Sequence, residues 1–384
     1  RPTSQHHSSE FTMRNLLKEI QELANGGKAA AFCRLVETRG STPQKAGATM
    51  LVYPDGSQAG TLGGGCVEAE VKRKALLIME DTASQIESFQ LNSDYGWDDG
   101  LICGGRMQIL VTPVNNASAR EYCGHIVQLL EQERGFTEAI VFDESSDFEL
   151  ADRVLLDSQQ QFVASTSAGI TDSCDAALLQ TIKDHTKPIL NRPRAYAQSG
   201  IAFLPSLERC RLVIVGGGHV GKAVADLAYD LDFNVWVVDD RDTIVSEDRF
   251  PRAEQRLVGG VDEILPDLPI DSNTYCLIVT RGHNHDEEAL YHLAERGARY
   301  VGLIGSTRKI KMIYDDLLEE GVSSDALQNV FAPLGIDIGS QTVPEIAVSI
   351  CAELVSHRNQ SGYVPGRPEP IRVSAKPESL QQQD

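Results

Sequence analysis

A glycine-rich run at Gly216–Gly221, which reads GGGHVG, has the composition and spacing of a phosphate-binding loop. It follows an apolar strand pattern, Leu212–Val215, and precedes a helical pattern, Ala223–Leu231. Asp239 closes the next strand pattern, where the acid of a Rossmann fold bonds a ribose hydroxyl. Together these features predict a Rossmann fold that binds a nucleotide or nucleotide-like cofactor. A Rossmann fold that has lost its ligand is the alternative.

The glycines of this loop have separate expected roles. Gly216 permits the tight turn, Gly218 lets the backbone approach a phosphate, and Gly221 lets the helix and the strand pack closely. The following helix offers free N–H groups and a partial positive charge at its N-terminus, beside His219. We therefore predict that Gly216, Gly218, His219 and Gly221 bind the cofactor, together with Asp239.

A second helix start, Gly305–Lys309, follows another strand pattern and carries hydroxyls and cations. Ser306, Arg308 and Lys309 make a locally basic spot in an acidic protein, where an anion could bind. A capped helix with solvated charges is the alternative, and both interpretations stay open.

The loop Thr280–Asp286, TRGHNHD, also follows a strand pattern and therefore lies at the carboxyl edge of the sheet. Open α/β sheets bind ligands at this edge, so we predict that Thr280, His283 and Asp286 line the pocket. The His-x-His-Asp pattern could also ligate a metal. The simpler interpretation is a hydrogen-bonded histidine, with Asp286 capping a helix over Glu287–Ala294.

Two cysteines lie in glycine-rich surroundings that suit reactive thiols. Cys66 follows a glycine-rich turn and precedes a helical pattern over Val67–Asp81, and a helix N-terminus lowers the pKa of a thiol. Cys103 also lies beside glycines, near Arg106. Such thiols suit sulfur transfer or metal ligation, and a structural role is the alternative. Of the other six cysteines, four lie in apolar runs that favour the core, namely Cys33, Cys210, Cys276 and Cys351.

The charge of the chain limits the classes of partner. A formal net charge of −20 argues against binding nucleic acid or an anionic membrane, since both need a basic face. An anionic ligand needs only a local positive pocket, and Arg39 lies in a polar, basic loop, Thr38–Lys45, that could grip one. No apolar run is long enough to span a membrane. Scattered cysteines without a CxxC pair or a signal peptide predict reduced thiols in the cytoplasm.

Two domains must position these residues. Residues 206–358 alternate strand and helix patterns, which predicts a Rossmann-type parallel sheet with helices on both faces. Residues 13–205 predict an α+β domain, residues 1–12 a flexible extension and residues 359–384 a disordered tail. The α+β domain has helical patterns at Asn15–Ala24, Val67–Asp81 and Asp175–Asp184, and strand patterns at Ala29–Thr38, Ala48–Tyr53, Met107–Thr112 and near 139–142, 153–156 and 201–204.

These segments together resemble the XdhC/CoxI family, the accessory proteins of xanthine dehydrogenase and related molybdenum hydroxylases. The middle of the chain, 118–205, carries little of the resemblance. One departure is SQTVP at Ser340–Pro344, where the family pattern is closer to A-x-T-P-E, although Pro344 and Glu345 still provide a helix start. The matching segments are Arg39–Met50, Gly60–Val71, Cys103–Pro113, Val213–Gly221, Val237–Arg241, Thr280–Asp286, Tyr300–Lys309 and Pro333–Leu354.

The resemblance implies a cofactor chaperone in preference to a small-molecule enzyme. It implies binding of the molybdenum cofactor, a molybdopterin with a phosphate, its sulfuration, and its delivery to a molybdenum hydroxylase such as xanthine dehydrogenase. A cysteine desulfurase would supply the sulfur, and a homodimer is compatible with the resemblance. The phosphate would lie at Gly216–Gly221 or at Ser306–Lys309. Cys66 and Cys103 would act as catalytic residues or molybdenum ligands.

Two other classes of function remain open. An NAD(P)-dependent oxidoreductase would use the same glycine loop, with His283 or His285 as the proton donor. A nucleotide-sensing module would bind a nucleotide without chemistry, and its function would not need the thiols.

Overall fold

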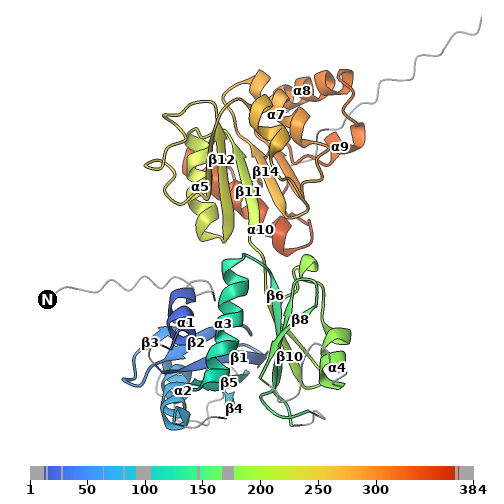
Figure 1. Ribbon diagram of the computed structural model, residues 1–384. Coiled ribbons are helices and arrows are strands. Elements are labelled where there is room, and N and C mark those ends of the chain that lie inside the picture. The colour runs from blue at the N-terminus through green and yellow to red at the C-terminus, as the bar shows by residue number, and fades with distance from the viewer. Residues whose placement is uncertain are drawn as a thin grey trace, which may run out of the picture. The chain divides into compact units, whose positions relative to one another are not determined.

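The computed structural model describes residues 13, 16–26, 29–63, 65–80, 83–91, 105–144, 148–166, 177–367 and 371. The chain divides into two compact units, Arg1–Glu208 and Arg209–Asp384 (Figure 1). The extension predicted at residues 1–12 and most of the tail predicted at 359–384 lie outside the described residues.

The first unit contains two five-stranded antiparallel sheets, as the α+β prediction requires. The first sheet, in the order β3-β2-β1-β5-β4, consists of β1 (Ala30–Arg39), β2 (Thr49–Val52), β3 (Gln58–Gly60), β4 (Gln85–Gln90) and β5 (Arg106–Val114). The second, in the order β8-β7-β6-β10-β9, consists of β6 (Phe136–Val141), β7 (Arg153–Asp157), β8 (Phe162–Ser165), β9 (Tyr196–Gln198) and β10 (Ile201–Ser206). The helices are α1 (Leu17–Ala24), α2 (Gly65–Ile78), α3 (Ala117–Glu131) and α4 (Ala177–His185).

Helix α3 is the main element of this unit that the sequence did not predict. Its residues Cys123 and Val127 pack with α1 and the first sheet. Ile126 and Leu130, on another side of the helix, pack with the second sheet. A helix that contacts two sheets needs apolar residues on more than one face, so it lacks the single stripe by which amphipathic helices are recognised.

A buried ion cluster joins the two sheets and α3. Glu138 of β6 lies 3.0 Å from the Arg34 Nε of β1 and accepts a hydrogen bond of 2.9 Å from the Arg153 Nε of β7. The Tyr122 hydroxyl of α3 donates to the same carboxylate at 3.2 Å. Burial raises the pKa of Glu138, but Arg153 and Arg34 outweigh it and hold the pKa below its ordinary value. The cluster is therefore a closed internal contact of the first unit.

The second unit is a parallel five-stranded sheet in the order β13-β12-β11-β14-β15, the Rossmann strand order. Its strands are β11 (Cys210–Val215), β12 (Phe233–Asp239), β13 (Gln255–Val258), β14 (Thr274–Ile278) and β15 (Tyr300–Leu303). Its helices are α5 (His219–Asp230), α6 (Val261–Ile264), α7 (His283–Leu293), α8 (Thr307–Glu319), α9 (Ser324–Gln328) and α10 (Val343–Asn359).

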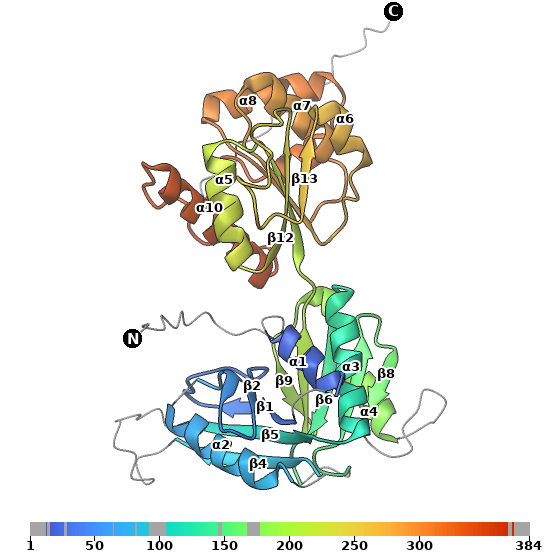
Figure 2. The same cartoon turned by 60° about the vertical axis from the view of Figure 1, so that its left-hand side comes forward.

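Helices cover both faces of this sheet, as predicted (Figure 2). Leu212 and Ile214 of β11 pack with α5 and α10 on one face. Val213 and Val215 pack with α7 and α8 on the other. A strand buried on both faces reads as a continuous apolar run, which is why β11 was evident in the sequence.

Two helix starts differ in their agreement with the sequence. Helix α10 begins after Thr342, which forms a capping box with Glu345, so the predicted helix start is present despite the departure from the family pattern. The predicted start of α7 at Glu287 was wrong. Helix α7 begins at His283, with Gly282 as its N-cap, and Asp286 lies inside the helix instead of capping it.

Candidate cofactor site

The glycine loop between β11 and α5 has the geometry that its sequence predicts. Gly216 has a φ of +113°, and a Cβ there would lie 2.5 Å from the Val279 carbonyl oxygen. A Cβ at Gly221 would lie 2.0 Å from the Gly216 carbonyl oxygen. A Cβ at Gly218 would meet no atom within 4 Å. Packing therefore requires glycine at positions 216 and 221, whereas Gly218 borders open space.

The N-terminus of α5 is open toward a ligand. Gly218 is the N-cap and provides no side-chain hydrogen bond, and His219, the first helical residue, is exposed. The first N–H groups of a helix have no partner within the helix, and the helix dipole favours an anion there. This helix start can therefore bind a phosphate without displacing a side-chain cap.

Asp239, the predicted ribose-binding acid, is buried and already engaged. Its carboxylate accepts hydrogen bonds from the Gly217 N–H at 2.8 Å, the Arg241 N–H at 3.2 Å, and the Arg241 Nε and Nη2 at 2.7 and 2.8 Å. Burial raises the pKa of Asp239, but these hydrogen bonds outweigh it and lower the pKa. A ribose would have to compete with Arg241 for this carboxylate.

Arg249, which was not predicted from the sequence, also holds the glycine loop in place. Its Nη2 donates to the carbonyl oxygens of Gly217 and Gly218 at 3.2 and 3.3 Å. It lies in the segment between β12 and β13, where no motif marks it. Arg249 therefore adds a second guanidinium group, beside that of Arg241, at the carboxyl edge of the sheet.

A pocket of about 160 Å³ lies at this edge, beside the loop. Arg281, exposed above it, lies 3.7 Å from the carboxylate of Asp240. His285 of α7 lines the pocket, whereas His283 does not. The lining consists of Val215, Gly216, Val238, Asp239, Asp240, Gly259, Gly260, Val261, Asp262, Thr280, Arg281, His285 and Glu288. The lining therefore has four carboxylates and one arginine, and of the glycine loop it includes Gly216.

Thr280 and Asp286 form a link between loop and helices. Asp286 is fully buried and accepts hydrogen bonds from the backbone N–H of Thr280, at 3.2 Å, and from its hydroxyl. Its other oxygen pairs with the Lys309 ammonium of α8. The charge of Lys309 is therefore used inside the fold, and Asp286 positions the Thr280 loop.

The second predicted helix start is capped. Ser306 is the N-cap of α8, and its hydroxyl accepts a hydrogen bond of 3.4 Å from the Lys309 N–H. Ser306 and Arg308 are exposed. Because Ser306 caps the first turn and Lys309 is already paired, the start of α8 has fewer free hydrogen-bond donors and charges for an anion than the start of α5.

Two motifs of the first unit pack against a third, the loop that follows β1. A Cβ at Gly105 would lie 2.2 Å from the Ser41 carbonyl oxygen, and one at Gly63 would lie 2.2 Å from the Gln44 Cγ. Arg39 at the end of β1 pairs in register with Arg106 of β5. The glycine-rich turn before α2 and the start of β5 therefore both pack against residues 39–44.

The turn before α2 is closed by Glu68, which the sequence analysis did not select. Its carboxylate accepts hydrogen bonds from the backbone N–H groups of Leu62 and Gly63 at 2.9 and 3.2 Å, and from the Thr61 hydroxyl. Partial burial raises the pKa of Glu68, but these bonds and one from Gln58 outweigh it and lower the pKa. Glu68 thus fixes the turn that leads to Cys66.

The predicted thiols are only partly visible. Cys66 lies in the first turn of α2, as predicted, but its side chain is outside what the structure describes, and so is the whole of Cys103. The four cysteines predicted in the core are buried there. Burial raises the pKa of Cys276 to about 12, so this thiol is inert at neutral pH.

Comparison with known proteins assigns both units. Residues 212–354 match the XdhC Rossmann domain, and residues 23–90 match the domain described as the XdhC and CoxI family.

The chain belongs to the XdhC and CoxI family.

The Rossmann match contains every cofactor-binding residue predicted in the second unit. The XdhC and CoxI match contains Arg39 and Cys66 but ends before Cys103.

Similar proteins cover nearly the whole XdhC-family chain. It is 26% identical over 356 residues to a probable xanthine dehydrogenase subunit of Bacillus subtilis (strain 168), covering 92% of this chain and 98% of that protein. It is 23% identical over 355 residues to "Molybdenum cofactor insertion chaperone PaoD" of Escherichia coli (strain K12), covering 92% of each. A crystal structure named as a xanthine dehydrogenase from Bacillus halodurans has the same fold, with a TM-score of 0.72, 22% identity, and coverage of 90% and 96%. In the described part of the chain, no helix is long and apolar enough to span a membrane.

Proposed function

We propose that this XdhC-family chain binds the molybdenum cofactor, aids its sulfuration and delivers it to a molybdenum hydroxylase of the xanthine dehydrogenase type. The observation that carries the proposal is the uncapped start of α5 at Gly218, beside an acid that is already engaged. The similarity to a cofactor insertion chaperone over 92% of both chains supports it.

The residues at this edge fit the phosphate of a molybdopterin. The α5 N–H groups would hold the phosphate, and the space beside Gly218 would let it approach the backbone. Arg281 of the pocket lining and Arg249 on the Gly217 carbonyl would offset part of the negative charge of the pocket carboxylates. Arg241 engages Asp239, the acid that an NAD-binding Rossmann fold keeps free for the ribose, so the same edge is less suited to an unphosphorylated ribose.

The first unit would supply the thiols for sulfuration. The cofactor would supply the molybdenum centre that receives the sulfur. Cys66 and Cys103 would ligate the metal or relay sulfur to it, because soft thiolates suit both roles. Glu68 would keep the turn before Cys66 in place. Arg39 would add a cation near these segments.

The partners follow from this assignment. A hydroxylase would be the client, a cysteine desulfurase would supply the sulfur, and the chaperone would act in the cytoplasm, where its thiols stay reduced. A homodimer would be the working form. The test is to mix the chain and its cofactor with the cofactor-free hydroxylase and to measure hydroxylase turnover. The proposal requires activation to depend on the chain and to fall at least tenfold with Cys103→Ala.

Retention of the cofactor is tested separately. The wild-type chain, purified from cells that make the cofactor, should carry both molybdenum and pterin, measured by elemental analysis and by fluorescence after oxidation. Gly218→Ala should carry less of both, because its methyl group enters the space of the phosphate. Absence of both from the wild type, with cofactor synthesis confirmed, would overturn the proposal. Tight NADH binding and turnover of a carbonyl substrate would favour an oxidoreductase.

A further inference from the structure

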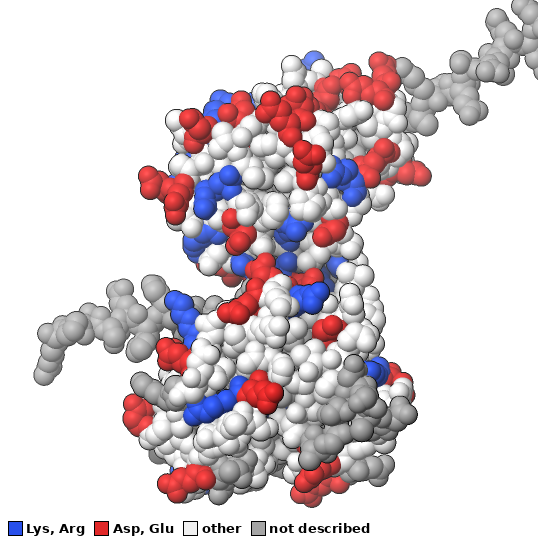
Figure 3. Space-filling view, viewed as in Figure 1, with Lys and Arg blue, Asp and Glu red and all other residues white. Residues whose placement is uncertain are grey.

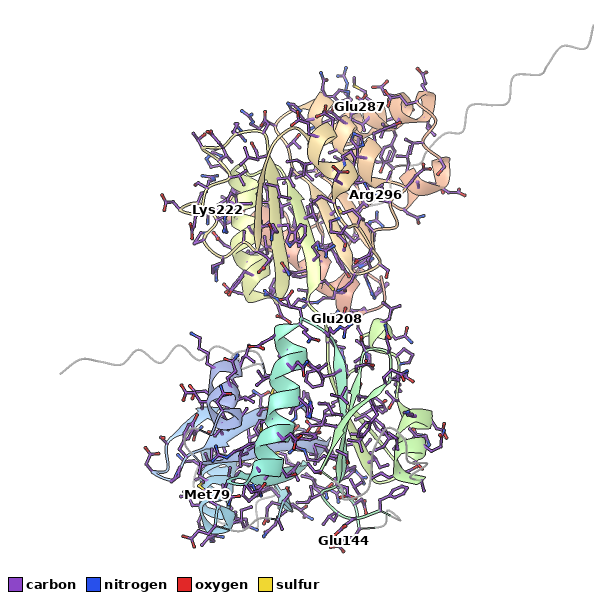
Figure 4. The ribbon with its side chains drawn as sticks, in the orientation of Figure 1. Met79, Glu144, Glu208, Lys222, Glu287 and Arg296 are labelled. Atoms are coloured by element: carbon purple, nitrogen blue, oxygen red, sulfur yellow. The ribbon has the colours of Figure 1, made fainter. Side chains whose placement is uncertain are left out.

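Three ligand-bearing side chains converge between α7 and α8. His283 and Glu287 lie one turn apart on the same face of α7, and Asp316 faces them from α8. The His283 Nε2 lies 3.3 Å from the Glu287 Oε2 and 3.7 Å from the Asp316 Oδ2. One ligand atom from each residue lies within 4.8 Å of the other two. Figure 4 labels Glu287 on α7.

The cluster has an excess of negative charge. Among the residues that the structure describes, neither Glu287 nor Asp316 pairs with a lysine or an arginine; their shared ion-pair partner is the imidazole of His283. Figure 3 shows acidic side chains gathered over α7 and α8. Two close carboxylates without a cation are electrostatically unfavourable.

We propose that His283, Glu287 and Asp316 bind one divalent transition-metal ion. An imidazole nitrogen and two carboxylate oxygens form a donor set used for Mn²⁺ and Zn²⁺, and the partial exposure of the three side chains leaves room for water ligands. The donors come from two helices, so the geometry does not depend on one mobile loop. His283 is absent from the lining of the pocket at the glycine loop, where His285 lies instead. The site therefore does not depend on the proposed function.

A metal here would join α7 to α8 by a second link. The first is the contact of the buried Asp286 with Lys309. Asp286 also bonds the Thr280 loop, so the metal would stabilise the helix that carries this anchor. A metal that binds only the folded state stabilises that state, and the stabilisation grows with the logarithm of the ratio of metal concentration to dissociation constant. The melting temperature should therefore rise as metal is added.

The test is titration of the full chain with Mn²⁺, followed by the loss of the electron paramagnetic resonance signal of the free ion. Mn²⁺ is the probe because it prefers oxygen and imidazole donors to the thiolates elsewhere in the chain. We expect saturation at one ion per chain. Glu287→Gln and Asp316→Asn should each raise the dissociation constant at least tenfold. Asp315→Asn removes the same charge from the neighbouring position of α8 and should change it less than twofold.

The melting temperature gives a second readout on the same proteins. Saturating Mn²⁺ should raise it in the wild type and in Asp315→Asn but not in Glu287→Gln. All three substituted side chains are partly or fully exposed, so the variants should fold, which circular dichroism checks. Failure of the wild type to bind Mn²⁺ or Zn²⁺, or unchanged affinity in both Glu287→Gln and Asp316→Asn, would overturn the proposal.

Discussion

The glycine-rich turns before α2 and α5 are closed in different ways. In the first unit the turn before α2 is closed by Glu68 of α2 itself, which takes the N–H groups of Leu62 and Gly63. In the second unit the turn is closed from a neighbouring strand by Asp239, and the start of α5 has no side-chain cap. Similar composition therefore gives one turn that is closed by an acid of its own helix and one turn whose helix start is uncapped.

The largest expected effect is on the packing of the second turn. In Gly221→Ala the new methyl group would overlap the Gly216 carbonyl oxygen, and separating them should cost about 1–3 kcal/mol or more of the free energy of unfolding. The measurement is urea unfolding in a Trp97→Phe background, followed by the fluorescence of Trp236 in β12 of the second unit. A change below about 0.5 kcal/mol would contradict the close approach.

The first turn should depend on its carboxylate. Glu68→Ala leaves the Leu62 N–H without its acceptor and the Gly63 N–H with the Thr61 hydroxyl alone, which should cost about 1–2 kcal/mol because the site is partly exposed to water. Protease cleavage at the turn should also become faster, measured by mass spectrometry of the fragments. Glu70→Ala, on the same helix, is the control and should leave the cleavage rate unchanged. Equal cleavage rates in Glu68→Ala and Glu70→Ala would show that Glu68 does not close the turn.

Acid should open the first turn through the same group. The folded state holds the pKa of Glu68 below the ordinary value of 4.5, so its stabilising effect is complete above pH 4.5. That effect is lost as the pH falls through the lowered pKa of the folded state. Unfolding measured between pH 6 and 3 should therefore show a smaller loss of stability in Glu68→Gln than in the wild type. Parallel curves would contradict this linkage.

The smallest effect on stability is expected at Gly218, where a methyl group meets no protein atom. Gly218→Ala should change the free energy of unfolding by less than about 0.5 kcal/mol. Its effect should appear in ligand binding, where a phosphate would meet the new methyl group. The pair Gly218→Ala and Gly221→Ala therefore separates a glycine needed by the ligand from one needed by the fold.

The sequence predicted the second unit better than the first. Its strand β11 is buried on both faces, and packing requires glycine at positions 216 and 221 of its loop, so both leave local patterns. The edge strand β13 was missed because Gln255–Val258 is short, polar and largely exposed. Helix α3 was missed because its apolar residues face two sheets.

The site was predicted less completely than the fold. Residues whose contacts lie far along the chain, such as Arg249 on the Gly217 carbonyl, have no local signal. The engagement of Asp239 by Arg241 was also hidden, because a Rossmann acid and a paired aspartate have the same sequence position. Motif glycines can be recognised from their spacing in the sequence. Whether a carboxylate is free or paired depends on residues that are its neighbours only in the folded chain.

The central claim is that the open start of α5 binds the molybdenum cofactor in preference to a dinucleotide. The most direct measurement is equilibrium binding of the isolated cofactor and of NADH to the purified chain, each with the wild type and with Gly218→Ala. We predict that the wild type binds the cofactor, that Gly218→Ala binds it at least tenfold more weakly, and that excess NADH does not displace it. Tight NADH binding that excludes the cofactor, or equal cofactor binding by both proteins, would contradict the account.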